Sequence, residues 1–213
     1  MFCNCKIEEK FKKTYLFNYL IEKGTNIIFV TQKILEKILE KTNPSDYLMV
    51  VKKKIFKLKS NNNNKVFLAL DRIRDPGNLG SIFRTMNGAE INCCFLIDEC
   101  VDPYSPEVVK ASMGSIFSIN FHIISSEKFL DWVKRNRINL IGSSALGSKK
   151  YFNFEWPLPM SLLLGNESNG ISPKLKKQCL EIIKIPIKNR VESLNISVSA
   201  GILIYDINRK YPI

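Results

Sequence analysis

Between residues 66 and 210, short apolar runs alternate with stretches of helical periodicity, and this alternation constrains the fold more than any other feature of the sequence. The runs are rich in Val, Ile, Leu and Phe, which is typical of strands buried on both faces. Helical stretches between such strands form the crossovers of a parallel sheet. The sequence therefore predicts an α/β fold in which helices cover both faces of a mainly parallel sheet.

The pattern also gives the expected positions of these elements. Strands are predicted at residues 66–71, 92–98, 119–124, 139–145, 160–165 and 182–187. Helices are predicted near residues 78–89, 106–116, 126–136, 172–180 and 195–209. Because ligands of parallel sheets bind outside the carboxyl ends of the strands, a functional site is expected in the loops that follow them.

A run of asparagine from Asn61 to Asn64 separates this region from a different N-terminal part. We expect a linker at residues 61–65, between parts at residues 1–60 and 66–213. The first part is predicted to be a small α/β unit. Its expected elements are helices at residues 6–22 and 31–41 and strands at residues 26–30 and 46–56.

Positive charge is concentrated in the N-terminal part. The chain carries 32 Lys and Arg against 20 Asp and Glu, a net charge of +12, and residues 1–65 hold 14 Lys against 6 acids. A basic segment joined to a nearly balanced body favours a polyanionic partner, above all nucleic acid. Part of the lysine excess could serve solubility alone.

The sequence gives no sign of a membrane segment or of a metal site. No apolar run approaches the roughly 20 residues that span a bilayer, and the first 13 residues are charged where a signal peptide is apolar. The six cysteines then indicate reduced thiols. Cys3 and Cys5 form no CxxC pair and have no histidine cluster nearby, so we expect a cytoplasmic protein without a metal site.

The first loop of chemical interest is DPGNLGSIFRT, residues 75–85, which follows the strand at 66–71. Pro76 and Gly77 form a turn, Asn78 can cap the next helix, and Arg84 lies one or two turns into it. The glycine spacing fits neither a dinucleotide fingerprint nor a phosphate-binding loop. On their own, Asn78 and Arg84 are better explained as a helix cap and a solvated helix residue than as functional residues.

Two further loops place polar residues after buried segments. In LLLGNESNGIS, residues 162–172, the strand ends at Gly165, and Glu167 follows it. In RVESLNIS, residues 190–197, Ser193, Leu194 and Asn195 open the last helix. Each set has an ordinary structural explanation, because acids favour helix N-termini and serine is a common helix cap.

Taken together, N-x5-R, L-G-N-E and S-L-N occur in the order and with the spacing of the three motifs of the SpoU (TrmH-type) RNA ribose 2′-O-methyltransferases, a family of the SPOUT superfamily. The sequence resembles this family over residues 66–210, including the segment at 102–117. The resemblance implies a C-terminal trefoil knot, a rare exception to unknotted connections. It also implies S-adenosylmethionine as cofactor, RNA as substrate, and a homodimer through the knot region and the C-terminal helix.

The resemblance carries functional roles onto matching positions of this chain. It implies cofactor contacts by Gly165, Ile185 and Leu194, and catalytic roles for Asn78, Arg84, Glu167, Ser193 and Asn195. Arg84 could act as the base that removes the 2′-hydroxyl proton, or it could orient a neighbouring phosphate. The first role is costly because a guanidinium holds its proton at any physiological pH.

The segment at residues 26–56 resembles the C-terminal portion of the L30e-like RNA-binding domain that precedes many of these enzymes. The first 60 residues are fewer than the full domain needs, so we expect a truncated L30e-like segment. It favours ribosomal RNA over tRNA as the substrate. The alternatives are a tRNA ribose methyltransferase, an RNA-binding relative without catalysis, and an enzyme that methylates a base.

Overall fold

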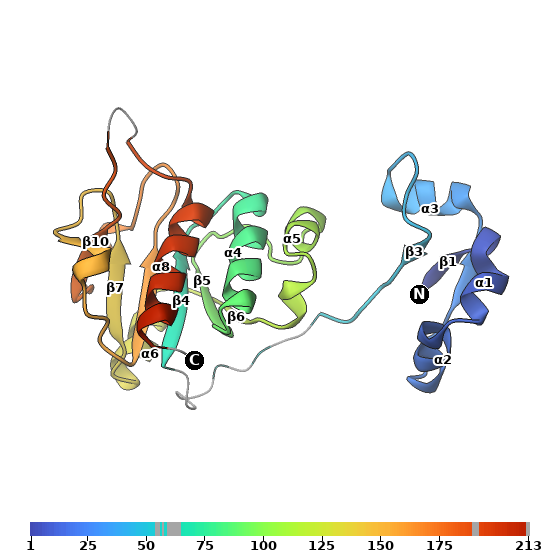
Figure 1. The fold of residues 1–213 in the computed structure, drawn as a ribbon, viewed down its shortest axis with the longest axis horizontal. Coiled ribbons are helices and arrows are strands. Elements are labelled where there is room, and N and C mark those ends of the chain that lie inside the picture. The colour runs from blue at the N-terminus through green and yellow to red at the C-terminus, as the bar shows by residue number, and fades with distance from the viewer. Residues whose placement is uncertain (54–55, 57, 59–64, 189–191, 212–213) are drawn as a thin grey trace. The chain divides into compact units, whose positions relative to one another are not determined.

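The computed structural model describes residues 1–53, 56, 58, 65–188 and 192–211, and the chain divides into two compact units, residues 1–54 and 55–213 (Figure 1). The linker predicted at 61–65 lies outside the described residues except for Lys65. The L30e-like character of the first unit stays a prediction. The two units are described separately below.

The first unit has a three-stranded sheet in the order β2-β1-β3. The central strand, β1 (Phe2–Asn4), is parallel to β2 (Ile28–Val30) and antiparallel to β3 (Tyr47–Leu48). The helices are the 3-10 helix Cys5–Ile7, α1 (Glu8–Lys12), α2 (Tyr15–Glu22) and α3 (Gln32–Leu39). Cys3, Phe11 and Leu20 form its buried cluster.

Two predictions for this unit were wrong in detail, and one strand was missed. The strand β1 was not expected, and among the described residues of the strand expected at 46–56 only Tyr47–Leu48 form a strand. The single helix expected at 6–22 is interrupted, because the hydroxyl of Thr14 accepts a hydrogen bond from the amide of Phe17 at 3.2 Å and caps a new helix. Threonine at such a position starts a helix and does not continue one.

The second unit contains a seven-stranded sheet in the order β6-β5-β4-β9-β7-β10-β8, in which every pairing between described strands is parallel. The strands are β4 (Val66–Asp71), β5 (Cys93–Ile97), β6 (Asn120–Ile124), β7 (Asn139–Ser143), β8 (Lys149–Lys150), β9 (Met160–Leu164) and β10 (Glu181–Lys184). All six predicted strands are present. The short strand β8 was missed because its two exposed lysines give no apolar signal.

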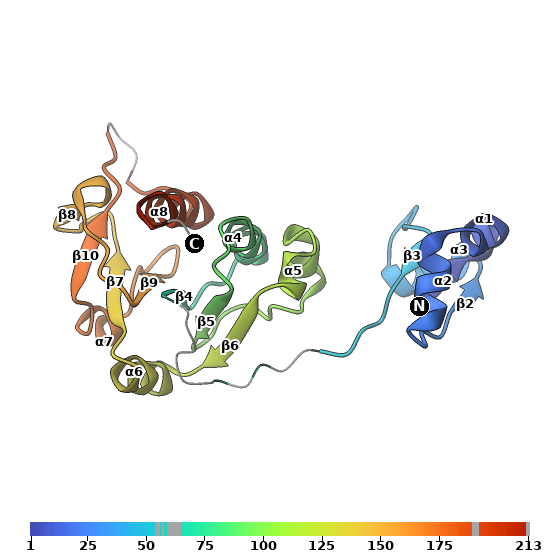
Figure 2. The same ribbon diagram turned by 60° about the horizontal axis from the view of Figure 1, so that its bottom comes forward.

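Helices cover both faces of this sheet, as predicted. Figure 2 shows α4 (Pro76–Gly88), α5 (Pro106–Ala111) and α8 (Ile196–Lys210) on one face, and α6 (Ser126–Arg135) and α7 (Pro173–Lys176) on the other. Two helices are shorter than expected. Met113 and Gly114, with φ of +49° and +86°, turn the chain after α5. After α7 the amide of Leu180 already bonds to the carbonyl of Leu140 in the sheet.

Alternation along the strands divides the core into two layers. Leu68 and Leu70 of β4 belong to the cluster on the side of α4 and α8, whereas Phe67 and Ala69 belong to the cluster that includes Phe129 of α6. Both faces of the central strand are therefore buried, which explains its continuous apolar sequence. No helix in the described part of the chain is long and apolar enough to cross a bilayer. The trefoil knot stays a prediction.

Candidate active site

Polar residues from three distant segments meet at the carboxyl edge of the sheet. Strands β4 and β9 are neighbours in parallel register, with Leu70 beside Leu164. Their following loops, at residues 72–75 and 165–172, therefore leave the sheet from the same edge. The first turn of α4 and the start of α8 also reach this edge, because Asn78 contacts both the 165–172 loop and Asn195.

The first turn of α4 leaves the side chain of Asn78 available for contacts with other segments. Asp75 is the helix cap, because its Oδ1 accepts a hydrogen bond from the amide of Asn78 at 2.6 Å. The prediction that Asn78 caps this helix was therefore wrong. Pro76 occupies the first helical position, where its missing N–H costs nothing.

Asn78 joins the other two predicted motifs. Its Nδ2 donates to Oε1 of Glu167 at 3.1 Å, and its Oδ1 accepts from Nδ2 of Asn195 at 2.9 Å. Oδ1 of Asn195 accepts from the backbone amide of Ser197 at 2.8 Å and so caps α8. Asn195, and not Ser193, is thus the cap of this helix, and it connects the helix to Asn78.

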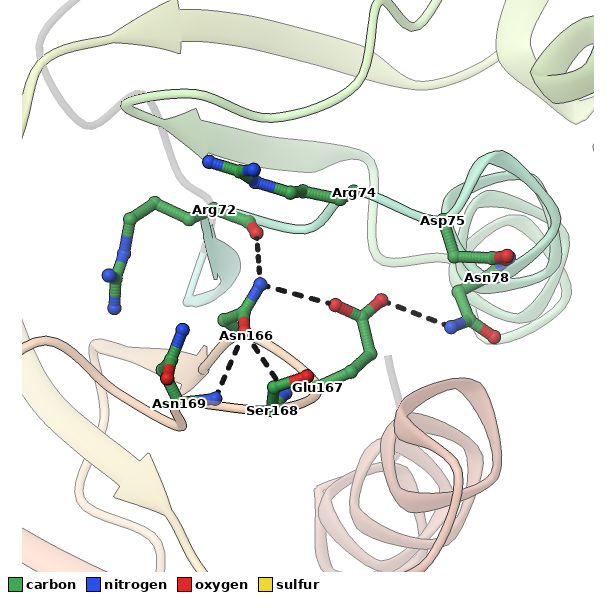
Figure 3. Close-up of a pocket in the computed structure, with 8 residues that line it drawn as sticks. All are labelled: Arg72, Arg74, Asp75, Asn78, Asn166, Glu167, Ser168 and Asn169. Atoms are coloured by element: carbon green, nitrogen blue, oxygen red, sulfur yellow. Dashed lines mark hydrogen bonds between the residues drawn. The ribbon is translucent and has the colours of Figure 1, made fainter.

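The turn that presents Glu167 is built by Asn166 (Figure 3). Oδ1 of Asn166 accepts hydrogen bonds from the amides of Ser168 and Asn169, both at 3.0 Å. Its Nδ2 donates to the carbonyl of Arg72 at 2.8 Å and to Oε2 of Glu167 at 3.4 Å. A side chain that closes a turn onto its own backbone is a typical use of asparagine. Asn166 was not among the predicted site residues.

A pocket of about 540 Å³ opens beside this network. Figure 3 shows its lining, which mixes two guanidinium groups with carboxylates and amides. The lining residues are Arg72, Arg74, Asp75, Asn78, Asn166, Glu167, Ser168 and Asn169. The predicted residues Asn78 and Glu167 are among them.

Two predicted catalytic residues are not joined to this network. Arg84 is exposed on α4, six residues beyond Asn78, and Ser193 is exposed before α8. Within the described part of the chain, neither side chain bonds to Asn78, Glu167 or Asn195. Their catalytic roles stay predictions.

The predicted cofactor contacts lie at the ends of β9 and β10 and before α8. Gly165 lies where two backbone segments touch, because a β-carbon there would be 2.2 Å from both the carbonyl carbon of Gly170 and the amide nitrogen of Ile171. Ile185 is half-buried against the core cluster of α4 and α8, and Leu194 is half-buried. Residues 189–191, between them, lie outside the described part of the chain.

A second place where two backbone segments pass close together was not predicted from the sequence. A β-carbon at Gly147, in the loop after β7, would lie 2.4 Å from the carbonyl carbon and oxygen of Ile183. The glycine in SALGSKK could have suggested it, but its short loop has no other marker. Among the described residues, no group of three His, Cys, Asp or Glu side chains could hold a metal ion.

Comparisons with known proteins place the second unit in a family. The model of the SpoU rRNA Methylase family matches residues 65–205. The TrmH family protein YacO of Bacillus subtilis (strain 168) is 33% identical over 150 residues, which cover 70% of this chain and 60% of YacO. The 23S rRNA (uridine(2479)-2′-O)-methyltransferase of Streptomyces viridochromogenes is 32% identical over 146 residues, 66% of this chain and 51% of that enzyme.

The chain thus spans between half and three fifths of these two relatives. Among solved structures, the AdoMet-bound rRNA methyltransferase from Sinorhizobium meliloti matches with a TM-score of 0.84 at 26% identity, over 100% of this chain and 80% of that one. The family match covers the sheet, the helices up to residue 205 of α8, and the three motifs that meet at the carboxyl edge. The chain belongs to the SpoU rRNA Methylase family.

Proposed function

We propose that the chain is an RNA methyltransferase that transfers a methyl group from S-adenosylmethionine to a ribose 2′-hydroxyl, with ribosomal RNA as the favoured substrate. The observation that carries the proposal is the hydrogen-bonded series Glu167–Asn78–Asn195, which joins the three motifs at the carboxyl edge of the sheet. The activity of the Streptomyces relative supports the ribose 2′-oxygen as the acceptor. The alternatives are a tRNA ribose methyltransferase and a relative that binds RNA without catalysis.

The cofactor would be held by Gly165, Ile185 and Leu194. The backbone crossing at Gly165 leaves no room for a side chain, and the two half-buried apolar side chains suit the uncharged parts of an adenosine. The bound AdoMet in the Sinorhizobium structure supports this assignment. The cofactor supplies the methyl group on a sulfonium, and the chain supplies position and the route of the hydroxyl proton.

The polar residues orient the acceptor. Glu167 and Asn195 fix both ends of the Asn78 amide, so that this side chain has one orientation toward the pocket. Ser193 lies two residues before Asn195 and would contact the RNA backbone. Arg84 would remove the 2′-hydroxyl proton or orient a neighbouring phosphate, and the second role needs no loss of its own proton.

We also propose a homodimer through the knot region and α8. Val198 and Tyr205, with exposed fractions of 51% and 52%, lie seven residues apart on one face of α8, with Gly201 between them. An exposed apolar stripe with a glycine in the middle allows a second helix to approach closely. Val198→Glu should convert the dimer to a monomer in light scattering, and an unchanged mass would contradict this interface.

The experiment that tests the function is transfer of tritiated methyl groups from S-adenosylmethionine to unmodified ribosomal RNA and tRNA, followed by nucleoside analysis. A 2′-O-methylnucleoside in the ribosomal RNA is the expected product, and the same product in tRNA alone would favour the first alternative. A methylated base would contradict ribose transfer. Binding of RNA without binding of S-adenosylmethionine would favour the noncatalytic alternative. Normal turnover by Arg84→Ala would contradict both roles of Arg84.

A further inference from the structure

A buried carboxylate lies at the end of β4. Its hydrogen-bond partners either belong to the 165–172 loop or contact that loop themselves. The side chain of Asp71 is fully buried, and a buried carboxylate needs hydrogen-bond donors to offset its lost hydration. Its Oδ2 accepts from the backbone amide of Ser172 at 2.6 Å. Its Oδ1 and Oδ2 also accept from Nε and Nη2 of Arg72 at 2.9 and 3.3 Å.

Arg72 extends these contacts to the rest of the loop. Its Nη2 donates to the carbonyl of Gly170 at 3.3 Å, and its own carbonyl accepts from Nδ2 of Asn166 at 2.8 Å. The residue has a φ of +56°, a left-handed conformation that arginine rarely adopts. The carbonyl and the guanidinium of this one residue thus reach two positions of the same loop. Figure 3 shows the first contact, between the Arg72 carbonyl and Asn166.

Asp71 and Arg72 therefore contact the loop at Asn166, Gly170 and Ser172, on both sides of Glu167. Hydrogen bonds between charged partners are stronger than neutral ones, and a two-bond pair also fixes direction. The hydrogen bond that Arg72 donates to Asp71 also raises the pKa of the Arg72 guanidinium, so the guanidinium keeps its charge. In the sequence, Glu167 lies between these contacted residues, with Asn166 before it and Gly170 and Ser172 after it.

We propose that Asp71 and Arg72 are positioning residues, which hold the 166–172 loop so that the carboxylate of Glu167 reaches Asn78. The proposal rests on the proposed methyl transfer and adds two residues outside the three motifs. Neither residue needs to touch the cofactor or the RNA for this role. They act through the loop, whose geometry sets the position of Glu167 before substrate binds.

The first test removes the guanidinium and keeps the length of the side chain. Arg72→Met should lower kcat about 10- to 100-fold, the cost expected for small misplacement of a reacting group, while the KM for RNA changes less than threefold. Arg72→Lys should recover part of the loss, because an ammonium pairs with Asp71 but lacks the second bond. Equal loss in the Lys and Met variants would contradict the paired geometry.

Arg137→Met is the matched control. Arg137 also has a left-handed backbone, with φ of +52°, but it is exposed in the turn between α6 and β7. The same substitution there should leave kcat and KM unchanged. If Arg137→Met lowered kcat as much as Arg72→Met does, the loss would follow from replacing any arginine with a left-handed backbone. The contacts of Arg72 with the loop would then not explain it, and the proposal would be overturned.

A double-mutant cycle with Glu167→Gln asks whether Arg72 acts through Glu167. The glutamine amide would place a donor against Nδ2 of Asn166 or of Asn78, so the network breaks at this point. Arg72→Met should then slow the Glu167→Gln enzyme less than twofold, because the positioned group is already lost. A full additional 10-fold loss in the double variant would overturn the proposal.

Amide hydrogen exchange of the full chain separates this proposal from the proposed function. Arg72→Met should speed exchange in peptides that cover residues 165–172 at least about 10-fold, and Arg137→Met should not. This readout needs neither cofactor nor RNA. Unchanged exchange in Arg72→Met would overturn the positioning role, whereas faster exchange in a protein that methylates no RNA would overturn the methyl transfer alone.

Discussion

Asn78 and Glu167 are 89 positions apart in the chain, yet Nδ2 of Asn78 lies 3.1 Å from Oε1 of Glu167. The same asparagine accepts a hydrogen bond from Asn195, which is 117 positions from Asn78 in the chain. One amide therefore connects two helices and a loop. Its two ends have different partners, a carboxylate acceptor and an amide donor, so its orientation is determined by the fold.

Asn78→Asp should reduce methyl transfer more than Asn78→Ala does. The alanine variant removes the two hydrogen bonds, while the aspartate variant places a carboxylate beside that of Glu167, and like charges at this distance repel. We expect kcat losses of about 10-fold for alanine and about 100-fold for aspartate, measured in single-turnover transfer with saturating RNA.

The control for this pair is Asn87→Asp, the same change on the same helix. Asn87 is exposed, and its side-chain amide donates one long hydrogen bond, to the hydroxyl of Ser115 at 3.4 Å. Its turnover should stay within twofold of the unmodified chain. Equal activity of Asn78→Ala, Asn78→Asp and the unmodified chain would show that the network does not take part in the reaction.

Gly165→Ala should abolish cofactor binding while the protein stays folded. Its β-carbon would collide with the backbone of Gly170 and Ile171, which cannot move without shifting the loop that carries Glu167. Gly88→Ala is the matched control, because the nearest atom to its β-carbon is the flexible hydroxyl of Tyr205, at 3.2 Å. Calorimetric titration with S-adenosylmethionine should detect binding in the control and none in Gly165→Ala. Normal affinity of Gly165→Ala for S-adenosylmethionine would show that the close backbone approach at Gly165 is not part of the cofactor site.

The sequence was most informative where the hydrophobic pattern is periodic. The strands at 66–71 and 160–164 were predicted to within one residue, because both faces of each are buried and the apolar runs are continuous. The first unit was predicted less well, since its strands have only two or three residues each and its helices begin and end at local caps. Short elements leave too few positions for a period to appear.

For the site, local pattern identified residues but assigned some of their contacts wrongly. Asn78 and Asn195 were identified as site residues through the family resemblance, yet Asn78 was expected to cap α4, and the structure gives that role to Asp75. Asp71 and Arg72 gave no signal, because an acid at the end of a strand is common and its burial depends on the distant 166–172 loop. Contacts between residues about 100 positions apart, such as Asp71 and Ser172, can be predicted only once the pairing register of β4 and β9 is known.

Trp156→Phe should lower the free energy of unfolding by about 1–3 kcal/mol. The buried carboxylate of Asp206 loses a hydrogen-bond donor and keeps its ion pairs with Arg209 and Lys210. Trp156 is 1% exposed, and its Nε1 donates to Oδ2 of Asp206 on α8 at 3.0 Å. Urea unfolding followed by circular dichroism measures the change. In combination with Asp206→Ala the two losses should be less than additive, and full additivity would contradict a direct contribution from this bond.

The stability of the second unit should fall as the pH decreases below about 6.5, the ordinary pKa of histidine. His122 lies on the edge strand β6, and its ring contacts those of Phe95 and Phe56, with centroids at 5.5 and 6.3 Å. Burial lowers its pKa. Between its ordinary pKa and the lowered one, the unfolded chain binds a proton that the folded chain does not, so acid favours unfolding. Above pH 6.5 His122 is neutral in both the folded and the unfolded chain, so its contribution to the free energy of unfolding no longer changes with pH.

The measurement is urea unfolding of the full chain at half-unit steps from pH 7.5 to 5.5, a range in which exposed carboxylates stay ionised. His122→Gln should reduce the loss of unfolding free energy across this range, because glutamine keeps a polar side chain and cannot be protonated there. The two proteins should therefore differ in pH slope and not merely in overall stability. Parallel pH profiles would assign the acid sensitivity to other groups and leave His122 with a role in packing alone.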